Sequence, residues 1–283
     1  MKVLVLGASG MIGRTMFRVL SQHSDLLVCG SVRAKKFEGT APGPVFVGND
    51  LSNSDQLVRL FYKAKPDVVV NCAGLTKHLP DGNDPISALS MNALLPHRLA
   101  EHCSMVSARL IHVSTDCVFS GKVGKYSEED ATDATDVYGK TKAIGEVTGE
   151  NVLTLRTSTI GHEHGTSRGL LEWFLAQSEC KGFRQAIFSG LPTFELARIV
   201  RDVVIPNTTL NGLYNVGAGP IDKFNLLQLI AKVYNRNVKI VADEVFRIDR
   251  SLNVEKFLDA TGYRAATWPE LIEAMYQDNL SGK

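Results

Sequence analysis

A tyrosine and a lysine stand four residues apart in the segment 136–146, DVYGKTKAIGE. On an α-helix, positions i and i+4 lie on one face whereas positions i and i+2 do not, so Tyr138 should meet Lys142 rather than Lys140. A phenol ionises near pH ~10, and a neighbouring ammonium lowers that value. The pair therefore predicts a proton donor and acceptor of the kind that a hydride-transfer enzyme needs. Taken alone, the two residues fit an ordinary surface helix better, so the elements around them must decide.

A third candidate for the same chemistry comes from the apolar run 108–119, which is predicted to be a strand. This strand carries Ser114, Thr115 and Asp116 near its carboxyl end. A hydroxyl, a phenol and an ammonium that meet at a nicotinamide could reduce a carbonyl group. Thr115 would hold the carbonyl oxygen, Tyr138 would pass a proton to it, and Lys142 would lower the phenol pKa and bind a ribose.

A glycine-rich segment, LGASGMIG at 6–13, follows the first apolar run and opens a helical pattern. Glycines at Gly7, Gly10 and Gly13 permit a tight turn and let the backbone approach a pyrophosphate, which can rest on the helix N-terminus. The placement between a hydrophobic strand and an amphipathic helix makes the motif stronger than a glycine triplet alone. The cofactor-binding residues expected in this segment are Gly7, Ser9, Gly10, Met11, Ile12 and Gly13.

The end of the second predicted strand indicates which nicotinamide cofactor is used. An NAD site places a carboxylate there to hold the ribose hydroxyls, whereas this chain has Ser31 and Arg33 and no carboxylate. A serine and an arginine suit a 2′-phosphate, so NADPH is favoured and NADH is the alternative. Arg14, just past the glycine segment, is a further candidate for this phosphate.

Two other strand ends are expected to line the cofactor, because ligands bind at the carboxyl edge of such sheets. Asp50 and Leu51 follow the third strand and would meet the adenine. Cys72, Ala73 and Gly74 follow the fourth, where a bare backbone could lie along the cofactor. Ordinary turn chemistry is the alternative interpretation of both segments.

The order of elements predicts an α/β fold with a Rossmann-type, doubly wound parallel sheet. We expect a dinucleotide-binding domain at 1–160 and a smaller, mainly helical substrate lobe at 161–283, with segments near 192–235 packing back on the first domain. Strands are predicted at 2–7, 26–33, 44–50, 66–74, 108–119, 152–161 and 212–217. Helices are predicted at 13–23, 54–64, 84–104 (kinked at Pro96), 167–179, 193–204, 225–234, 254–262 and 269–278.

Composition excludes several classes of function. Lys and Arg number 31 against 30 for Asp and Glu, which gives a net charge of +1 and no basic field for nucleic acid. No apolar stretch approaches the ~20 residues of a membrane span.

Five scattered cysteines without a CxxC motif are typical of a reduced cytoplasmic chain. His162 and His164 flank Glu163, but no second ligand pair accompanies them, so no metal site is expected.

These motifs together resemble the extended short-chain dehydrogenase/reductases, and more closely the dTDP-4-dehydrorhamnose reductase family. The resemblance spans nearly the whole chain. It rests on the segments GASGMIG, PDVVVNCAG, STDCVFSG, VYGKTKAIGE, LRTS, LPTFELARIV and LNVEKF. It implies that Thr115, Tyr138 and Lys142 are the catalytic residues. It also implies NADPH-dependent (or NADH-dependent) reduction of the 4-keto group of a nucleotide-linked 6-deoxysugar, a reaction of deoxysugar and cell-surface polysaccharide biosynthesis.

The chain departs from the family pattern on the expected substrate side. Cys117 stands where tyrosine is common, and RTSTIGHEHG replaces a segment that usually carries aromatic residues. The sugar and its nucleotide (dTDP or UDP) are therefore left open. Arg247 and Arg250, placed before a predicted helix, suit a diphosphate, with Arg156 as a weaker candidate and ion pairs as the alternative role. The expected substrate-binding residues are Lys77, Asp116, Cys117, His162, Thr193, Arg247 and Arg250.

Three other functions are compared with a reductase. Family dehydratases follow the threonine with Asp-Glu, whereas Cys117 follows Asp116 here, which disfavours elimination. A nucleotide-sugar 4-epimerase uses the same Tyr and Lys, but such epimerases usually hold NAD, and Arg33 argues against that. A non-catalytic NADP-binding regulatory subunit, like that of methionine adenosyltransferase, is the third. The expected partners are a nucleotide sugar and, as one expectation, a second copy of the chain in a homodimer.

Overall fold

Seven parallel strands form the central sheet of the computed structural model, which describes residues 1–37, 41–76, 84–163 and 168–281. The strand order is β10-β6-β5-β4-β1-β2-β3. Strands β2 and β3 are added on one side of β1 and β4 to β6 on the other, so the order of strand addition reverses between β1 and β4. This confirms the predicted Rossmann-type α/β fold. The strands are β1 (Lys2–Leu6), β2 (Leu27–Ser31), β3 (Val45–Phe46), β4 (Val68–Asn71), β5 (Arg109–Val113), β6 (Val152–Arg156) and β10 (Gly212–Asn215).

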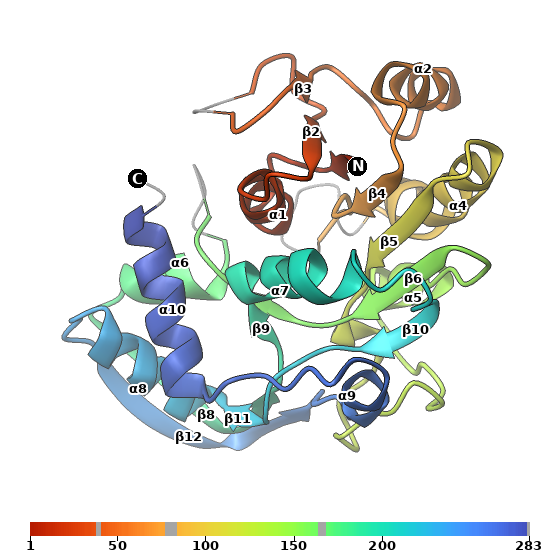
Figure 1. Ribbon diagram of the computed structural model, residues 1–283. Helices are drawn as coiled ribbons and strands as arrows, with labels where there is room; N and C mark the ends of the chain where they lie inside the picture. Colours follow the sequence, from red (N-terminus) through yellow and green to blue (C-terminus); the bar gives the residue numbers. More distant parts are fainter. Residues whose placement is uncertain (38–40, 77–83, 164–167, 282–283) are drawn as a thin grey trace.

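Helices cover both faces of this sheet (Figure 1). Successive strand residues point to opposite faces, so Val3 and Val5 join the apolar cluster around α1 while Leu4 and Leu6 join the cluster around α2 and α4. Because both faces are covered, the central strands are buried and mostly apolar, with polar exceptions such as Asn71 and His112. The helices of this half are α1 (Met11–Ser21), α2 (Ser54–Ala64), α3 (Pro85–Ala88), α4 (Leu95–Met105) and α5 (Val137–Ile144).

Pro96 does not produce the isolated kink that the sequence predicts. It occupies the first turn of α4, and the helical run before it widens into a π-helical segment, η2 (Leu89–Leu94). The backbone N–H of Leu95 bonds the carbonyl of Ser90, five residues back. The wider turn accommodates the proline, which lacks an N–H and would clash with the carbonyl four residues earlier.

The second half of the chain contains a sheet that the sequence pattern did not predict. Strands β8 (Glu179–Phe188), β12 (Lys239–Asp249) and β11 (Ile221–Asp222) form a three-stranded sheet in the order β11-β8-β12. A two-stranded pair, β7 (Thr159–Ile160) and β9 (Leu191–Pro192), accompanies it. The lobe therefore combines these strands with helices α6 (Leu170–Leu175), α7 (Thr193–Ile199), η4 (Val200–Val204), α8 (Lys223–Val233), α9 (Glu255–Thr261) and α10 (Trp268–Ser281).

Two segments of the second half belong structurally to the first. Strand β10 completes the central sheet beside β6, and α7 lies against α1 (Figure 1). Helices α8 and α10 pack against each other, and α8 also packs against β8 and β12. The domain boundary near residue 160 stays a prediction. Within the described ranges, no helix is long and apolar enough to cross a membrane.

Asn92, in the π-helical segment, fastens the loop after β4 to the helices beneath it. Its side chain accepts a hydrogen bond from the N–H of Leu75 (2.8 Å) and donates to the carbonyl of Leu75 (2.9 Å) and to Thr141 Oγ1 (3.3 Å). The side chain is 1% exposed. Its removal would leave buried backbone groups without partners.

We expect Asn92→Ala to lower the free energy of unfolding by about 3 kcal/mol, because each buried polar group that loses its partner costs about 1–3 kcal/mol. Urea denaturation followed by circular dichroism measures the change. Ile86→Ala, on an 80% exposed side chain of the same helical run, is the matched control and should change stability little. A loss no larger than that of the control would contradict the bracing role.

Candidate active site

The glycine segment forms the turn between β1 and α1. Gly7 has a φ of 75°, and a Cβ on it would lie 2.9 Å from the backbone of Ala73. The carbonyl of Ser31 accepts hydrogen bonds from the N–H groups of Gly7 and Ala8, both at 3.1 Å. Only glycine combines this backbone conformation with so close an approach. The ends of β1, β2 and β4 are therefore held together at one edge of the sheet.

The N-terminus of α1 fits a negatively charged group. Gly10 is the N-cap and has no side chain to cap the helix, and the first turn contains no acidic residue. Ser9 and Gly10 are exposed, Met11 and Ile12 are half-buried, and Gly13 is buried against the carbonyl of Gly7. The N–H groups of Gly7, Ala8 and Gly10 are bonded within the turn, so the part that suits a pyrophosphate is the uncapped first turn of α1 with the positive end of its helix dipole.

The two residues expected at a 2′-phosphate differ in accessibility. Arg33 is exposed at the end of β2, where a ligand can reach it. Ser31 is 1% exposed and its hydroxyl is enclosed, so its contribution is the carbonyl that holds the glycine turn. Arg14, in the first turns of α1, lies over the ring of Phe37, 5.3 Å from its centroid.

The remaining cofactor candidates lie at the ends of strands β3 and β4. Some of their polar groups form hydrogen bonds within their own turns. Asp50 Oδ1 accepts hydrogen bonds from the N–H (3.0 Å) and hydroxyl (2.7 Å) of Ser52, and the side chain of Leu51 is in the core. Ala73 donates its N–H to Asn71 Oδ1 at 3.1 Å. Gly74 is exposed, and Cys72 is half-buried with its pKa raised to about 12 by burial.

Helix α5 is seated so that Tyr138 meets Thr115. Asp136 caps the helix by accepting the N–H of Gly139 at 2.7 Å. A Cβ on Gly139 would lie 2.3 Å from the carbonyl of Cys117, so glycine lets the helix approach the turn after β5. Thr115 caps that turn by accepting the N–H of Cys117 at 3.1 Å, and its hydroxyl acts on Tyr138 by lowering the phenol pKa. The predicted hydroxyl and phenol are thus brought together.

The phenol pKa moves in the direction opposite to the sequence prediction. Burial raises the pKa of Tyr138 above its usual value, and the nearby Cys117, Asp116 and Asp136 add to that rise, while the hydrogen bond with Thr115 opposes it. The predicted lowering by Lys142 therefore does not set the net direction of the Tyr138 pKa, which burial determines. A protonated phenol is nevertheless the form required of an acid that donates a proton to a carbonyl oxygen.

Lys142 lies on the same helix as Tyr138 but binds the backbone. Its Nζ donates to the carbonyl of Val113 at 2.9 Å, and the side chain is 6% exposed. Burial lowers the pKa of Lys142 to about 8, against opposing charges on Glu146 and Cys72. Because Cys72 follows β4 beside the glycine turn, the ammonium lies between Tyr138's helix and the expected cofactor site.

Asp116, Cys117 and Arg250 form a second group beside Tyr138. Arg250 donates from Nε to the carbonyl of Phe119 (2.7 Å) and from a terminal nitrogen to Cys117 Sγ (3.7 Å). Burial raises the pKa of Asp116, and the charges of Arg250 and Lys223 oppose that rise. The carboxyl group of Asp116, which acts on Tyr138, is thus itself influenced by two cations.

The other expected substrate residues are placed elsewhere. Arg247 is an exposed residue of β12, paired with Gln185 of β8, and α9 is the next element along the chain. Thr193 is 4% exposed and lies 3.4 Å from Thr15 of α1, which makes it a packing contact. Lys77 lies outside the described residues.

His162 has both ring nitrogens engaged. Nδ1 lies 2.7 Å from Glu172 Oε1, and Nε2 lies 2.8 Å from the Tyr234 hydroxyl. Glu172 belongs to α6 and Tyr234 is the C-cap residue of α8, so the histidine joins these helices. In this conformation neither nitrogen is available to a substrate.

Sequence reasoning missed two residues at or next to the site, Lys223 and Glu146, and assigned a different role to Arg156. Lys223, the first residue of α8, acts on Asp116. Glu146 and Arg156 form an ion pair with a 2.6 Å contact, in which the side chains are 7% and 2% exposed. Arg156 is therefore not the diphosphate ligand considered from the sequence. The helical spacing from Lys142 to Glu146 is a signal that could have found the glutamate.

Comparison with known proteins identifies the family. The RmlD substrate binding domain family matches residues 1–278, nearly the whole chain. The chain belongs to this family. The RmlD family assignment agrees with the resemblance seen in the motifs.

Individual relatives of this RmlD-family chain carry two different names. The bovine methionine adenosyltransferase 2 subunit beta is 33% identical over 146 residues, which cover 51% of this chain and only 41% of the relative. The dTDP-4-dehydrorhamnose reductase of Aggregatibacter actinomycetemcomitans is 28% identical over 232 residues, 77% of this chain and 74% of the relative. The solved dTDP-4-dehydrorhamnose reductase of Bacillus anthracis in complex with NADP has the same fold, with a TM-score of 0.81, 20% identity, and coverage of 98% and 99% of the two chains.

The depressed pKa of Lys142 predicts a pH-dependent stability difference. The folded-state pKa of Lys142, about 8, lies below its usual value of 10.5. Between these two pH values the unfolded chain binds more protons than the folded chain, so the free energy of unfolding rises with pH. We expect wild type to gain about 2–3 kcal/mol relative to Lys142→Met between pH 7 and pH 10. Urea denaturation of both proteins across this range measures the difference. A constant difference would show that Lys142 titrates normally.

Proposed function

We propose that the chain is an NADPH-dependent reductase of the 4-keto group of a nucleotide-linked 6-deoxysugar. The observation that carries the proposal is that α5 brings Tyr138 beside Thr115, whose hydroxyl acts on the phenol pKa, with Lys142 one helical turn along the same helix and bonded to the carbonyl of Val113 at the end of β5. The family assignment and the names of the reductases with which the chain shares sequence and fold support it.

In this proposal each residue has a separate task. Tyr138 is the acid that passes its phenolic proton to the carbonyl oxygen, and Thr115 holds that oxygen through its hydroxyl. Lys142, when protonated, supplies positive charge beside the ribose and the developing phenolate. Asp116, Arg250 and Lys223 border the sugar side of the site.

A bound dihydronicotinamide would supply the hydride that adds to the carbonyl carbon. The residues that would hold the dinucleotide are those of the glycine turn, the uncapped N-terminus of α1 and the exposed backbone at Gly74. Arg33 would bind the 2′-phosphate that distinguishes NADPH from NADH.

A non-catalytic, NADP-binding regulatory subunit is the second candidate. It is favoured by the 33% identity to the bovine methionine adenosyltransferase 2 subunit beta, a match confined to about half of this chain. A 4-epimerase with retained NAD is chemically compatible with Thr115, Tyr138 and Lys142 as well. The three functions differ in net NADPH consumption, which only a reductase requires.

We expect NADPH oxidation with one member of a panel of dTDP- and UDP-4-keto-6-deoxysugars generated in situ. Tyr138→Phe should lower kcat by about 10²–10⁴-fold, because it removes the acid, and should leave the NADPH Kd nearly unchanged. Tyr62→Phe, at a 76% exposed tyrosine, is the matched control and should retain full activity. Absorbance at 340 nm and fluorescence titration measure the two quantities.

Full activity of Tyr138→Phe would refute the assigned acid. Firm NADPH binding without turnover of any sugar would favour the regulatory subunit, and interconversion of nucleotide sugars without net NADPH consumption would favour the epimerase.

The preference for NADPH is tested separately at Arg33. We expect Arg33→Ala to weaken NADPH binding about tenfold and to leave NADH binding unchanged, because a charge-assisted bond to a 2′-phosphate is lost. Arg59→Ala removes an exposed arginine from α2 and serves as the control for net charge. Equal effects of Arg33→Ala on the two cofactors would contradict a 2′-phosphate site at β2.

A further inference from the structure

Behind Thr115 and Lys142 lies a buried ion pair that the proposed chemistry does not use. Arg156, at the end of β6, donates from Nε to Glu146 Oε1 (2.9 Å) and from a terminal nitrogen to Glu146 Oε2 (2.6 Å). Two parallel bonds between a guanidinium and a carboxylate fix the orientation of both groups. The pair is nearly inaccessible to solvent.

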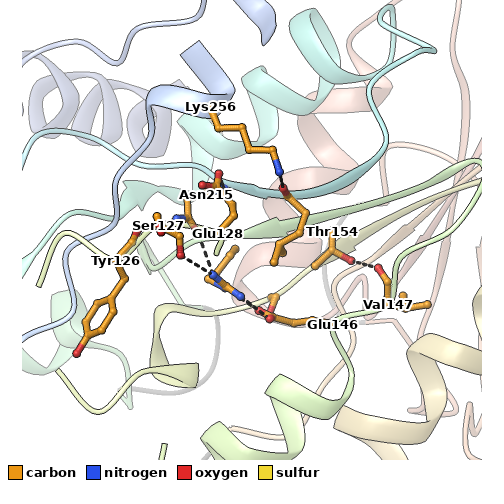
Figure 2. Close-up of polar contacts among 11 residues, drawn as sticks. Tyr126, Ser127, Glu128, Glu146, Val147, Thr154, Asn215 and Lys256 are labelled. Carbon is orange, nitrogen blue, oxygen red and sulfur yellow. Dashed lines mark hydrogen bonds and ion pairs between the residues drawn. The ribbon is translucent and has the colours of Figure 1, made fainter. Parts of the chain in front are cut away.

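The arginine side of this pair is anchored on several elements. Its other terminal nitrogen lies 3.4 Å from the carbonyl of Ser127 and 3.4 Å from Asn215 Oδ1 of β10, and the guanidinium stacks over Phe119 at 4.7 Å. Asn215 in turn donates to the carbonyl of Tyr126 at 2.9 Å. Figure 2 shows Glu146 and Asn215 joined by dashed contacts through this one guanidinium.

The glutamate side reaches the candidate site in two ways. Glu146 Oε1 accepts a hydrogen bond from Ser114 Oγ at 2.7 Å, and Ser114 immediately precedes Thr115. Glu146 also lies four residues after Lys142, just past the C-cap of α5, and its negative charge acts on that ammonium. Next to it, the carbonyl of Val147 accepts a hydrogen bond from Thr154 Oγ1 at 2.6 Å, which ties the same segment to β6 (Figure 2).

We propose that Glu146 is a positioning residue: its carboxylate, held by Arg156, fixes the end of β5 through Ser114, which lies between the Val113 carbonyl that binds Lys142 and the Thr115 hydroxyl. The inference rests on the proposed function for its role in turnover. The arrangement itself is a property of the folded chain.

The groups that face Lys142 show why such a charge matters. Burial disfavours the ammonium and lowers the pKa of Lys142 to about 8. The largest opposing influence on this pKa is the carboxylate of Glu146. Cys72, after β4, also opposes it, but burial raises the pKa of its thiol to about 12, so at neutral pH it carries no charge. His112 of β5 has its pKa lowered by burial, by Lys142 and by His97, so it is neutral as well. The acidic side chain that opposes the effect of burial on Lys142 is therefore that of Glu146.

The test follows the titration of Lys142 directly, by NMR of protein labelled with [ε-¹³C]lysine, with Lys142→Met assigning the resonance. We expect Glu146→Gln to lower the Lys142 midpoint by about one pH unit, because an opposite charge is lost. The alkaline limb of kcat should shift down by the same amount, while the NADPH Kd measured below pH 7 stays nearly unchanged.

Two further variants separate this effect from loss of stability. Because Glu146→Gln leaves Arg156 buried without its partner, the double variant Glu146→Met with Arg156→Met replaces the whole pair by apolar side chains, a change that folded proteins often tolerate. It should lower the Lys142 midpoint as well. Arg156→Lys keeps the charge of Glu146 paired and should retain the wild-type midpoint.

Arg109→Met is the control for burial. Arg109 is 7% exposed at the start of β5 and bonds the carbonyls of Val204 and Leu210, far along the strand from Thr115. It should reduce stability without moving the Lys142 midpoint. A midpoint unchanged in both Glu146 variants, with circular dichroism showing them folded, would overturn the inference. If the midpoint shifts while no sugar is reduced, the positioning role stands and the reductase proposal falls.

Discussion

The ion pair between Glu146 and Arg156 is the interaction on which the geometry of the candidate site depends. It joins the end of α5 to the end of β6, and through Ser114 and Asn215 it reaches β5 and β10. Removing one partner of a buried pair costs about 3–5 kcal/mol, because the other charge is left uncompensated. The arrangement of α5, β5, β6 and β10 that pairs both charges is therefore strongly favoured. Lys142 belongs to α5, and Thr115 follows the end of β5.

Burial sets the protonation of the site more strongly than any single neighbour does. Tyr138 and Asp116 have raised pKa values and Lys142 a lowered one, and in each case loss of solvent is the largest cause. All three shifts favour the neutral form, as expected where the surroundings are poorly polarisable. Nearby charges then decide how far each group departs from neutrality. The phenol consequently stays protonated, which is the form that a carbonyl reductase requires.

Irregular backbone on two sides of α5 also helps to position the candidate site. Gly139 lets the helix touch the turn that Thr115 caps, and the π-helical segment with Asn92 packs on the other side of the helix. A π-helical turn is less favourable than a regular one and recurs near functional sites. Here the same turn admits Pro96 and directs the Asn92 side chain to Leu75 and Thr141. The irregularity thus positions the helix that carries Tyr138 and Lys142.

Local pattern in the sequence determined the central fold and the principal site. Apolar runs followed by amphipathic stretches predicted the parallel sheet, and the glycine turn and the Tyr138–Lys142 spacing were found because they depend on neighbours within one helical turn or one loop. Strands β8 and β12 were missed because much of each is exposed and lacks an apolar run. The burial of Arg156, the pairing of His162 with Glu172 and Tyr234, and the raised pKa of Tyr138 depend on residues far apart in the chain. Those properties arise only when the tertiary structure removes water and brings the distant groups into contact, so only the folded structure decided them.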